Sequence, residues 1–244
     1  MHKKSTWICT LALVIIQIAY AIFAKNNFHH FIQRLDVFNN GYLDFILIVF
    51  FLIAGSATII SSEFEYGTIK ELLYRRYNRG EVLVSKWLTI FFYSLYWYIL
   101  TGLVTLILNT VVSKINLGHS AGHGYTYLTH FLASQGANLL ITWLLISLVF
   151  LLANIFNNSA VAVSVGIVGY FIVSVASGFL YSLIAKWEWV KWNPLTMLDY
   201  PNQITTPTIT HFTKLSLNQL AVGNLVYIAI FLGIGYLVFK KRNV

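Results

Sequence analysis

The sequence predicts an all-α protein that crosses a membrane several times. Hydrophobic residues make up 58% of its 244 residues and charged residues only 10%, and the mean hydropathy is +0.71, far from the balance of soluble globular proteins. Its apolar residues fall in six stretches, each long enough for a helix to cross a hydrocarbon core about 30 Å thick. These stretches are apolar on every side, whereas the strands of a membrane β-barrel alternate apolar and polar residues. We therefore predict a six-helix bundle in which residues 1–244 form a single transmembrane domain.

Each predicted span follows directly from one apolar stretch. The first has a basic start and contains Ala19-Tyr20-Ala21, a pattern that also occurs at the cleavage sites of secretory signals. We expect this stretch to remain as a span, because small residues are common in spans and the run stays apolar to Ala24. The six predicted spans are Thr6–Ala24, Tyr42–Ile60, Val84–Val112, Leu132–Phe156, Ser159–Ala185 and Leu220–Phe239.

The distribution of Lys and Arg predicts the orientation, since short cytoplasmic loops carry an excess of both. With the N-terminus inside, ten basic residues are cytoplasmic and six lie on the outer side, spread over longer loops. We expect a multi-pass protein of the cell membrane with both termini in the cytoplasm. The net charge of +8 suits an anionic leaflet, and no basic run with interleaved aromatics suggests nucleic acid as a partner. The ten are Lys3, Lys4, Lys70, Arg75, Arg76, Arg79, Lys86, Lys240, Lys241 and Arg242; the six are Lys25, Arg34, Lys114, Lys186, Lys191 and Lys214.

The interiors of the predicted spans contain no charged residue. Asp44 and Lys86 stand at span edges, which argues against a proton- or sodium-coupled carrier. Uncharged polar residues nearer the interior predict hydrogen bonds between helices. The seven histidines lie outside the spans or at their ends, and no His-Glu-x-x-His or Gly-x-Ser-x-Gly motif occurs, so we predict no catalytic residue. The polar residues are Gln17, Asn109, Asn138 and Asn224.

Metal and disulfide chemistry have weak candidates. The single cysteine, Cys9, has no partner within the chain; we interpret it as a small buried residue, with lipidation as the alternative. His119 and His123 have the i, i+4 spacing that binds metal on a helix. The surrounding glycines disfavour a helix, so we expect a flexible outer loop and no metal site.

Charge is concentrated between the second and third spans, in residues 61–82. Tyr66, Ile69, Leu73 and Tyr77 recur there at helical spacing, with charged residues around the rest of the turn. This pattern predicts a short amphipathic helix at the cytoplasmic membrane surface. One interpretation is a docking element for a soluble partner; the other is an interfacial helix that only connects two spans.

The string Glu65-x-Gly67-Thr68-Ile69-Lys70-x-Leu72-Leu73, followed by Arg79, Leu83 and Lys86, resembles the signature of type-2 ABC exporter permeases. That family also has six spans, cytoplasmic termini and a long outer segment before the last helix, so the resemblance covers the whole chain. One departure is Arg76-Tyr77-Asn78-Arg79, where the family commonly has Pro-x-Ser-Arg.

The resemblance implies that this loop is a coupling helix that docks on an ABC ATPase subunit. Apolar side chains of the helix would fit a groove on that partner and charged ones would pair at the rim. The chain has no phosphate-binding loop, so ATP and Mg²⁺ are expected on the ATPase and no cofactor on this chain. A second copy of the permease or a homologous permease is expected to complete the pathway. The implied coupling residues are Glu63, Glu65, Tyr66, Gly67, Thr68, Ile69, Lys70, Leu72, Leu73, Arg75 and Arg79.

The outer loop, residues 186–219, contains all three prolines and a tryptophan cluster, Trp187, Trp189 and Trp192. These aromatics fit an interfacial belt. By analogy with the family, the loop forms short re-entrant or surface helices that close the outer end of the pathway, and the tryptophans then also contact the substrate. Small-residue spacings such as Ala162-x-x-x-Gly166 predict close helix packing, either within the chain or between permeases.

The chemical class of the cargo is inferred from the lack of charged residues in the predicted spans. An apolar path suits an amphipathic peptide better than a sugar or a metal ion. Small permeases with the ATPase on a separate chain resemble exporters of antimicrobial and cytolytic peptides, including lantibiotic-immunity and phenol-soluble modulin exporters. We therefore predict peptide export, with lipid-linked glycan or drug efflux as further possibilities. The alternative is a stand-alone membrane immunity protein that binds and sequesters a peptide without an ATPase.

Overall fold

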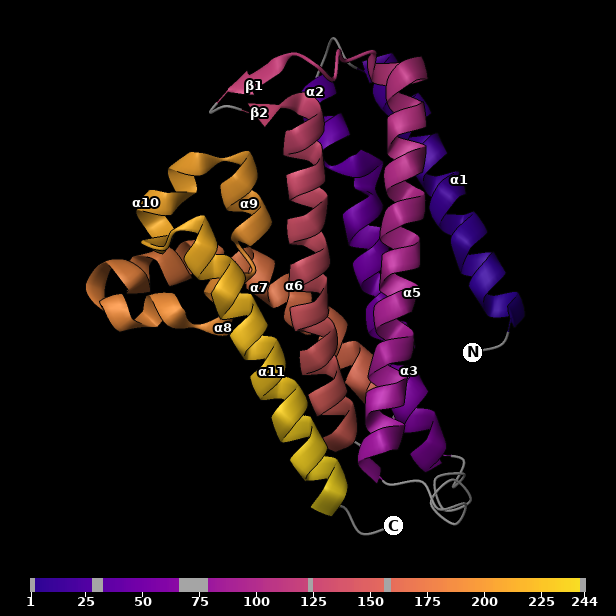
Figure 1. Cartoon of the computed structure of the whole chain (residues 1–244), viewed down its shortest axis with the longest axis vertical. Coiled ribbons are helices and arrows are strands. Elements are labelled where there is room, and N and C mark those ends of the chain that lie inside the picture. Colours follow the sequence, from indigo (N-terminus) through magenta and orange to yellow (C-terminus); the bar gives the residue numbers. More distant parts are fainter. Residues whose placement is uncertain (1–2, 28–32, 66–78, 123–124, 156–158, 242–244) are drawn as a thin grey trace. The chain divides into compact units, whose positions relative to one another are not determined.

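The computed structural model describes residues 3–27, 33–65, 79–122, 125–155 and 159–241. Most of these residues are helical (Figure 1). Among them, five helices are long and apolar enough to cross a membrane, and they match five predicted spans. The chain is therefore a multi-pass membrane protein of helical fold. The five are α1 (Lys3–Asn27), α3 (Asp44–Glu65), α5 (Arg79–Leu108), α6 (Tyr127–Ile155) and α11 (Leu217–Lys241).

These long helices expose large apolar side chains, and exposure of this much apolar surface to water would be unfavourable. Along α1, Trp7, Ile8, Leu11 and Ile15 are each more than half exposed. Contiguous apolar surface on this scale marks contact with lipid or with another protein, and helices can present it to lipid because their backbone groups are satisfied internally.

The remaining predicted span corresponds to α7 (Ser159–Lys186), a helix of 28 residues. A Cβ atom on its Gly166 would lie 2.7 Å from Ile53 Cγ2 and 3.0 Å from Val149 Cγ2. The small residue at position 166 therefore serves packing within the chain. A Cβ on Gly178 of the same helix would meet no atom within 4 Å among the described residues.

The chain divides into two compact units, each built from two stretches of sequence. Unit 1 comprises Met1–Phe51 and Ser94–Leu139, and unit 2 comprises Leu52–Tyr93 and Leu140–Val244. The helices α3, α5 and α6 each contribute residues to both units.

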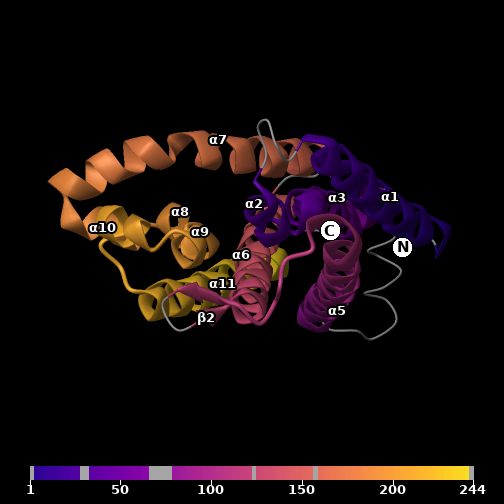
Figure 2. The same ribbon diagram turned by 90° about the horizontal axis from the view of Figure 1, so that it is seen from above.

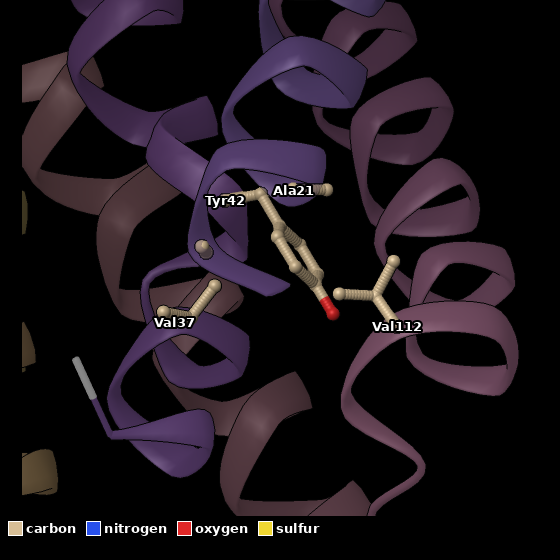
Figure 3. Close-up of a cluster of buried hydrophobic side chains, with 5 residues drawn as sticks. Ala21, Val37, Tyr42 and Val112 are labelled. Atoms are coloured by element: carbon tan, nitrogen blue, oxygen red, sulfur yellow. The ribbon is translucent and has the colours of Figure 1, made fainter. Parts of the chain in front are cut away.

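Unit 1 is organised around a break between two helices. After α2 (Arg34–Asn39), the 3₁₀ turn η1 (Gly41–Leu43) leads directly into α3. The Tyr42 side chain on this turn is fully buried, and Figure 3 shows its ring reaching toward Val112. Its hydroxyl group is 2.7 Å from Ser113 Oγ. The buried residues of this cluster are Ala21, Ala24, Val37, Tyr42 and Val112.

The outer end of unit 1 differs from the predicted flexible loop. After the π-helical turn η2 (Asn109–Ser113), β1 (Ser120–Gly122) pairs antiparallel with β2 (Tyr125–Thr126), with Ser120 opposite Thr126. In place of a flexible loop, the described residues here form paired strands, because backbone pairing satisfies their hydrogen bonds. His123 lies outside the described residues.

Unit 2 contains a series of short helices before α11. They are η3 (Glu188–Trp192), α8 (Pro194–Met197), α9 (Tyr200–Thr205), η4 (Pro207–Ile209) and α10 (Thr210–Thr213). Both α8 and α9 lie beside α11 (Figure 2). Prolines open three of the five, since proline fits the first turn of a helix. The core here consists of Leu144, Met197, Leu215, Leu220 and Ile228.

Candidate functional site

The predicted coupling segment is framed by two long helices. The helix α3 continues through Glu63 to Glu65, and α5 begins at Arg79. Of the predicted coupling loop, residues 61–82, the structure describes only the two ends, 61–65 and 79–82, and both are helical. The other predicted coupling residues lie outside the described residues: Tyr66, Gly67, Thr68, Ile69, Lys70, Leu72, Leu73 and Arg75.

Close contacts tie together the helices that flank this segment. Lys86 Nζ, on α5, donates a hydrogen bond of 2.6 Å to the carbonyl oxygen of Ile59 in the last turns of α3. Ile59 lies inside α3, more than one turn before its last residue, Glu65; a backbone carbonyl oxygen has two lone pairs, so it can accept from the lysine in addition to its helical N–H. A Cβ atom on Gly80 would overlap the ring of Tyr236 on α11. Within unit 2, the start of α5 is thus packed against both α3 and α11.

The short helices of the outer segment are held by buried polar contacts. Gln203 is 2% exposed; its Nε2 donates to the Leu215 carbonyl at 2.8 Å, and its Oε1 accepts from the Thr213 hydroxyl at 2.9 Å. On α11, Asn224 Nδ2 donates to the Met197 carbonyl at 3.0 Å. Met197 of α8 is therefore bonded to α11, while Gln203 of α9 holds the residues that lead into α11.

The predicted outer tryptophans stand on the surface of this segment. Trp187, Trp189 and Trp192 are 54%, 76% and 45% exposed. The Tyr227 hydroxyl on α11 donates to the backbone carbonyl of Trp192. The three indole rings remain available to lipid, as an interfacial belt requires, or to another molecule.

A buried polar cluster in unit 1 is the feature that sequence reasoning missed. Gln17, on α1, is 1% exposed. Its Nε2 lies 2.9 Å from the Gly41 carbonyl, 2.8 Å from Thr105 Oγ1 and 3.3 Å from the Thr101 carbonyl. The predicted role of Gln17 in bonding one helix to another is thus confirmed.

Asp44, the first residue of α3, is part of the same cluster. Its side chain is 1% exposed, and its Oδ2 accepts a 2.7 Å hydrogen bond from Gln135 Nε2 on α6. The Thr101 hydroxyl and the backbone N–H of Phe45 also interact with the carboxylate. All of these groups are neutral. The cluster therefore places one carboxylate among neutral donors, where four elements of unit 1 meet.

The backbone directly before Asp44 in the chain has an uncommon conformation. Gly41, Tyr42 and Leu43 have φ values of +54°, +54° and +70°, in the left-handed region that costs side-chain-bearing residues energy. A Cβ atom on Gly41 would overlap the Asp44 carboxylate. In the sequence, Asp44 directly follows the glycine-containing break. Because it stands at the edge of a predicted span, its burial was not predicted.

Comparison with known proteins supports the membrane assignment. A Bacillus subtilis (strain 168) protein named "Uncharacterized membrane protein YdbK" is 29% identical over 238 residues, which cover 96% of this chain and 90% of that protein. "Uncharacterized protein YhcI" from the same organism is 28% identical over 216 residues, or 82% of this chain. The alignment covers 65% of the length of YhcI. Residues 12–244 match the family described as "Protein of unknown function (DUF2705)", and the chain therefore belongs to this family.

Proposed function

We propose that the chain is the membrane-spanning permease subunit of an ATP-driven ABC exporter, with ATP hydrolysis on a separate ATPase subunit. The observation that carries this proposal is the string Glu65-x-Gly67-Thr68-Ile69-Lys70-x-Leu72-Leu73, which begins at the last residue of α3 and ends a few residues before α5. A docking element joined directly to two long apolar helices transmits movement of a soluble partner into the membrane.

Rigid attachment is what such transmission requires. The hydrogen bond from Lys86 to the Ile59 carbonyl and the packing of Gly80 against Tyr236 tie α5 to α3 and α11. A push on the coupling segment therefore moves a packed group of helices rather than one isolated helix. We propose that α7 is the sixth span and that both termini lie in the cytoplasm with the coupling segment.

The outer gate is proposed to be the segment of residues 186–219. Its short helices are joined to α11 through the carbonyl groups of Met197 and Trp192, which accept from Asn224 and Tyr227, so movement of α11 displaces them. Exposed aromatic rings at Trp187, Trp189 and Trp192 suit an amphipathic peptide leaving the pathway. A second permease copy, or a homologous permease, supplies the other half of the pathway in this proposal.

The test is co-purification with a candidate ATPase. The tagged chain is co-expressed with an ABC ATPase encoded beside it, and complex formation and ATPase activity are measured for wild type, Glu65→Arg and Gly67→Pro. Arginine reverses the charge at the docking surface, and proline breaks the coupling helix. Asp36→Arg is the matched control, because it makes a similar charge reversal at an exposed position on α2, outside both the coupling segment and the proposed gate.

We expect the wild type and Asp36→Arg to retain the ATPase, while Glu65→Arg and Gly67→Pro lose at least ten-fold in complex yield and in stimulated ATP hydrolysis at equal membrane expression. Absence of an adjacent ATPase gene, or a complex that both loop variants leave intact, would contradict the proposal. The first of these results would favour the stand-alone immunity protein, which sequesters a peptide without ATP.

A further inference from the structure

Three oxygen atoms of the buried cluster in unit 1 stand out because nothing donates to them. They are Gln17 Oε1, Asp44 Oδ1 and Gln135 Oε1, from α1, α3 and α6. Each is buried and accepts no hydrogen bond within the part of the chain that the structure describes. An unsatisfied buried polar atom destabilises the folded state, and a buried carboxylate without a cation destabilises it more. Three such oxygens in one cluster therefore indicate a missing positive charge or a missing donor.

These oxygens belong to side chains already joined through shared partners. The carboxylate of Asp44 and the amide of Gln17 both lie against Gly41, and both contact Thr101. Gln135 is hydrogen-bonded to Asp44 directly. A rotation of the Gln135 amide group would turn Oε1 toward Asp44 in place of Nε2; it gives up the present hydrogen bond to Asp44 Oδ2, and a cation between the two oxygens would replace that bond.

We infer that this cluster is a binding site for a monovalent alkali cation, Na⁺ or K⁺, held by Asp44 Oδ1 and the side-chain oxygens of Gln17 and Gln135. Hard cations take oxygen ligands. One carboxylate neutralises one positive charge, whereas a divalent ion would leave an uncompensated charge in the buried site. A single water molecule donates only two hydrogen bonds, so it leaves one of the three oxygens unsatisfied.

A pocket lies beside the residues that flank Asp44 in the chain. A pocket of about 370 Å³ lies at the helix break, and Leu43 and Phe45, the neighbours of Asp44 on either side, line it together with Asp36 and Gln33. The exposed carboxylate of Asp36 lends this pocket negative charge, which raises the local concentration of cations. The conformation of Gly41 keeps the space next to Asp44 free of a side chain.

Cation binding would fasten three helices to one another at the break between α2 and α3. Among the described residues, the groups that hydrogen-bond to the Asp44 carboxyl group are neutral. An alkali ion supplies the missing charge and ties α1 and α6 to the start of α3. This inference is independent of the proposed exporter, because it concerns one purified chain and requires no ATPase.

Two measurements on the purified full chain in detergent test the inference. The first is equilibrium binding of ²²Na⁺, with competition by K⁺ and by choline. The second is the thermal unfolding temperature at constant ionic strength, as NaCl or KCl replaces choline chloride at fixed pH. A ligand that binds only the folded state raises this temperature with its concentration.

The variants are Asp44→Asn, Gln135→Ala and Asp199→Asn. Asp199 is the matched control, because it is a buried carboxylate, 7% exposed, in unit 2. We expect saturable binding of about one ion per wild-type chain, a loss of at least ten-fold in affinity for Asp44→Asn, a loss of at least three-fold for Gln135→Ala, and wild-type affinity for Asp199→Asn.

Several results would overturn the inference. They are the absence of saturable ²²Na⁺ binding to the wild type, equal displacement by choline and by K⁺, equal affinity in Asp44→Asn, or stabilisation that follows pH alone, as expected of a proton on Asp44. If Asp44→Asn does not fold, the wild type and Gln135→Ala decide the question, since Gln135→Ala removes one ligand and leaves the buried charge in place.

Discussion

Replacing Gly41 by alanine tests whether Gly41, in the break before α3, lies in close contact with the Asp44 carboxylate. At this position the backbone has φ +54°, and a Cβ atom would overlap both carboxylate oxygens of Asp44. The added methyl group therefore forces either the backbone or the carboxylate to move. Movement of the carboxylate breaks its 2.7 Å hydrogen bond from Gln135 Nε2.

The size of the effect follows from these two consequences. A side-chain-bearing residue in the left-handed region costs about 1–2 kcal/mol. Loss of a hydrogen bond to a buried charged group costs about 1.5–3 kcal/mol. Partial relaxation shares the strain between backbone and side chain, so we expect Gly41→Ala to lower the free energy of unfolding by about 3 kcal/mol.

The matched control is Gly136→Ala, on α6 in the same unit, where a new Cβ atom meets nothing within 4 Å among the described residues. Alanine is favoured over glycine inside a helix by about 0.5–1 kcal/mol, so this variant is expected to be as stable as wild type or slightly more stable. Both are compared by reversible unfolding of the detergent-purified chain, followed by tryptophan fluorescence. Equal stability of the two variants would refute the close approach of Gly41 to Asp44.

The remaining predictions concern unit 2. A Cβ atom on Gly223 would overlap Met197 Sδ, whereas one on Gly233 would meet no described atom within 4 Å. Because the methionine side chain is flexible and can move aside, Gly223→Ala should lower the free energy of unfolding by only about 1 kcal/mol. Equal free energies of unfolding for Gly223→Ala and Gly233→Ala would contradict this packing. Burial raises the pKa of Asp199, opposed by hydrogen bonds from Tyr181 and Asn202. The folded protein then retains a proton that the unfolded chain has lost, so stability should fall as pH rises from about 4 through the raised pKa. Asp199→Asn should remove this slope, and an unchanged pH profile of the unfolding temperature would refute the assignment.

Different parts of the fold were predictable to different degrees. Apolar stretches of span length predicted α1, α3, α5, α6 and α11, because a helix that faces lipid must be apolar over the whole bilayer thickness. The ends of the helices were less predictable. The helix α3 continues to Glu65 because polar residues extend a helix without extending its apolar pattern.

The candidate coupling residues were assigned from the sequence alone, and most of them lie outside the described residues. The outer segment was predicted to form short helices, and α8, α9 and α10 confirm helices there. The antiparallel pairing of β1 with β2 was not predicted, because such short strands carry no alternating pattern of apolar and polar residues.

The sequence by itself determined that this is a multi-pass helical membrane protein, since that conclusion depends only on local composition and segment length. Only the tertiary structure decided that Asp44 is buried and which groups surround it. Gln17, Thr101 and Gln135 are far from one another along the chain. Through the packing of α1, α5 and α6 around the break at η1, Thr101 and Gln135 contact Asp44, and Gln17 contacts Gly41 and Thr101. Burial of one side chain depends on such long-range contacts, and no local pattern of residues encodes them.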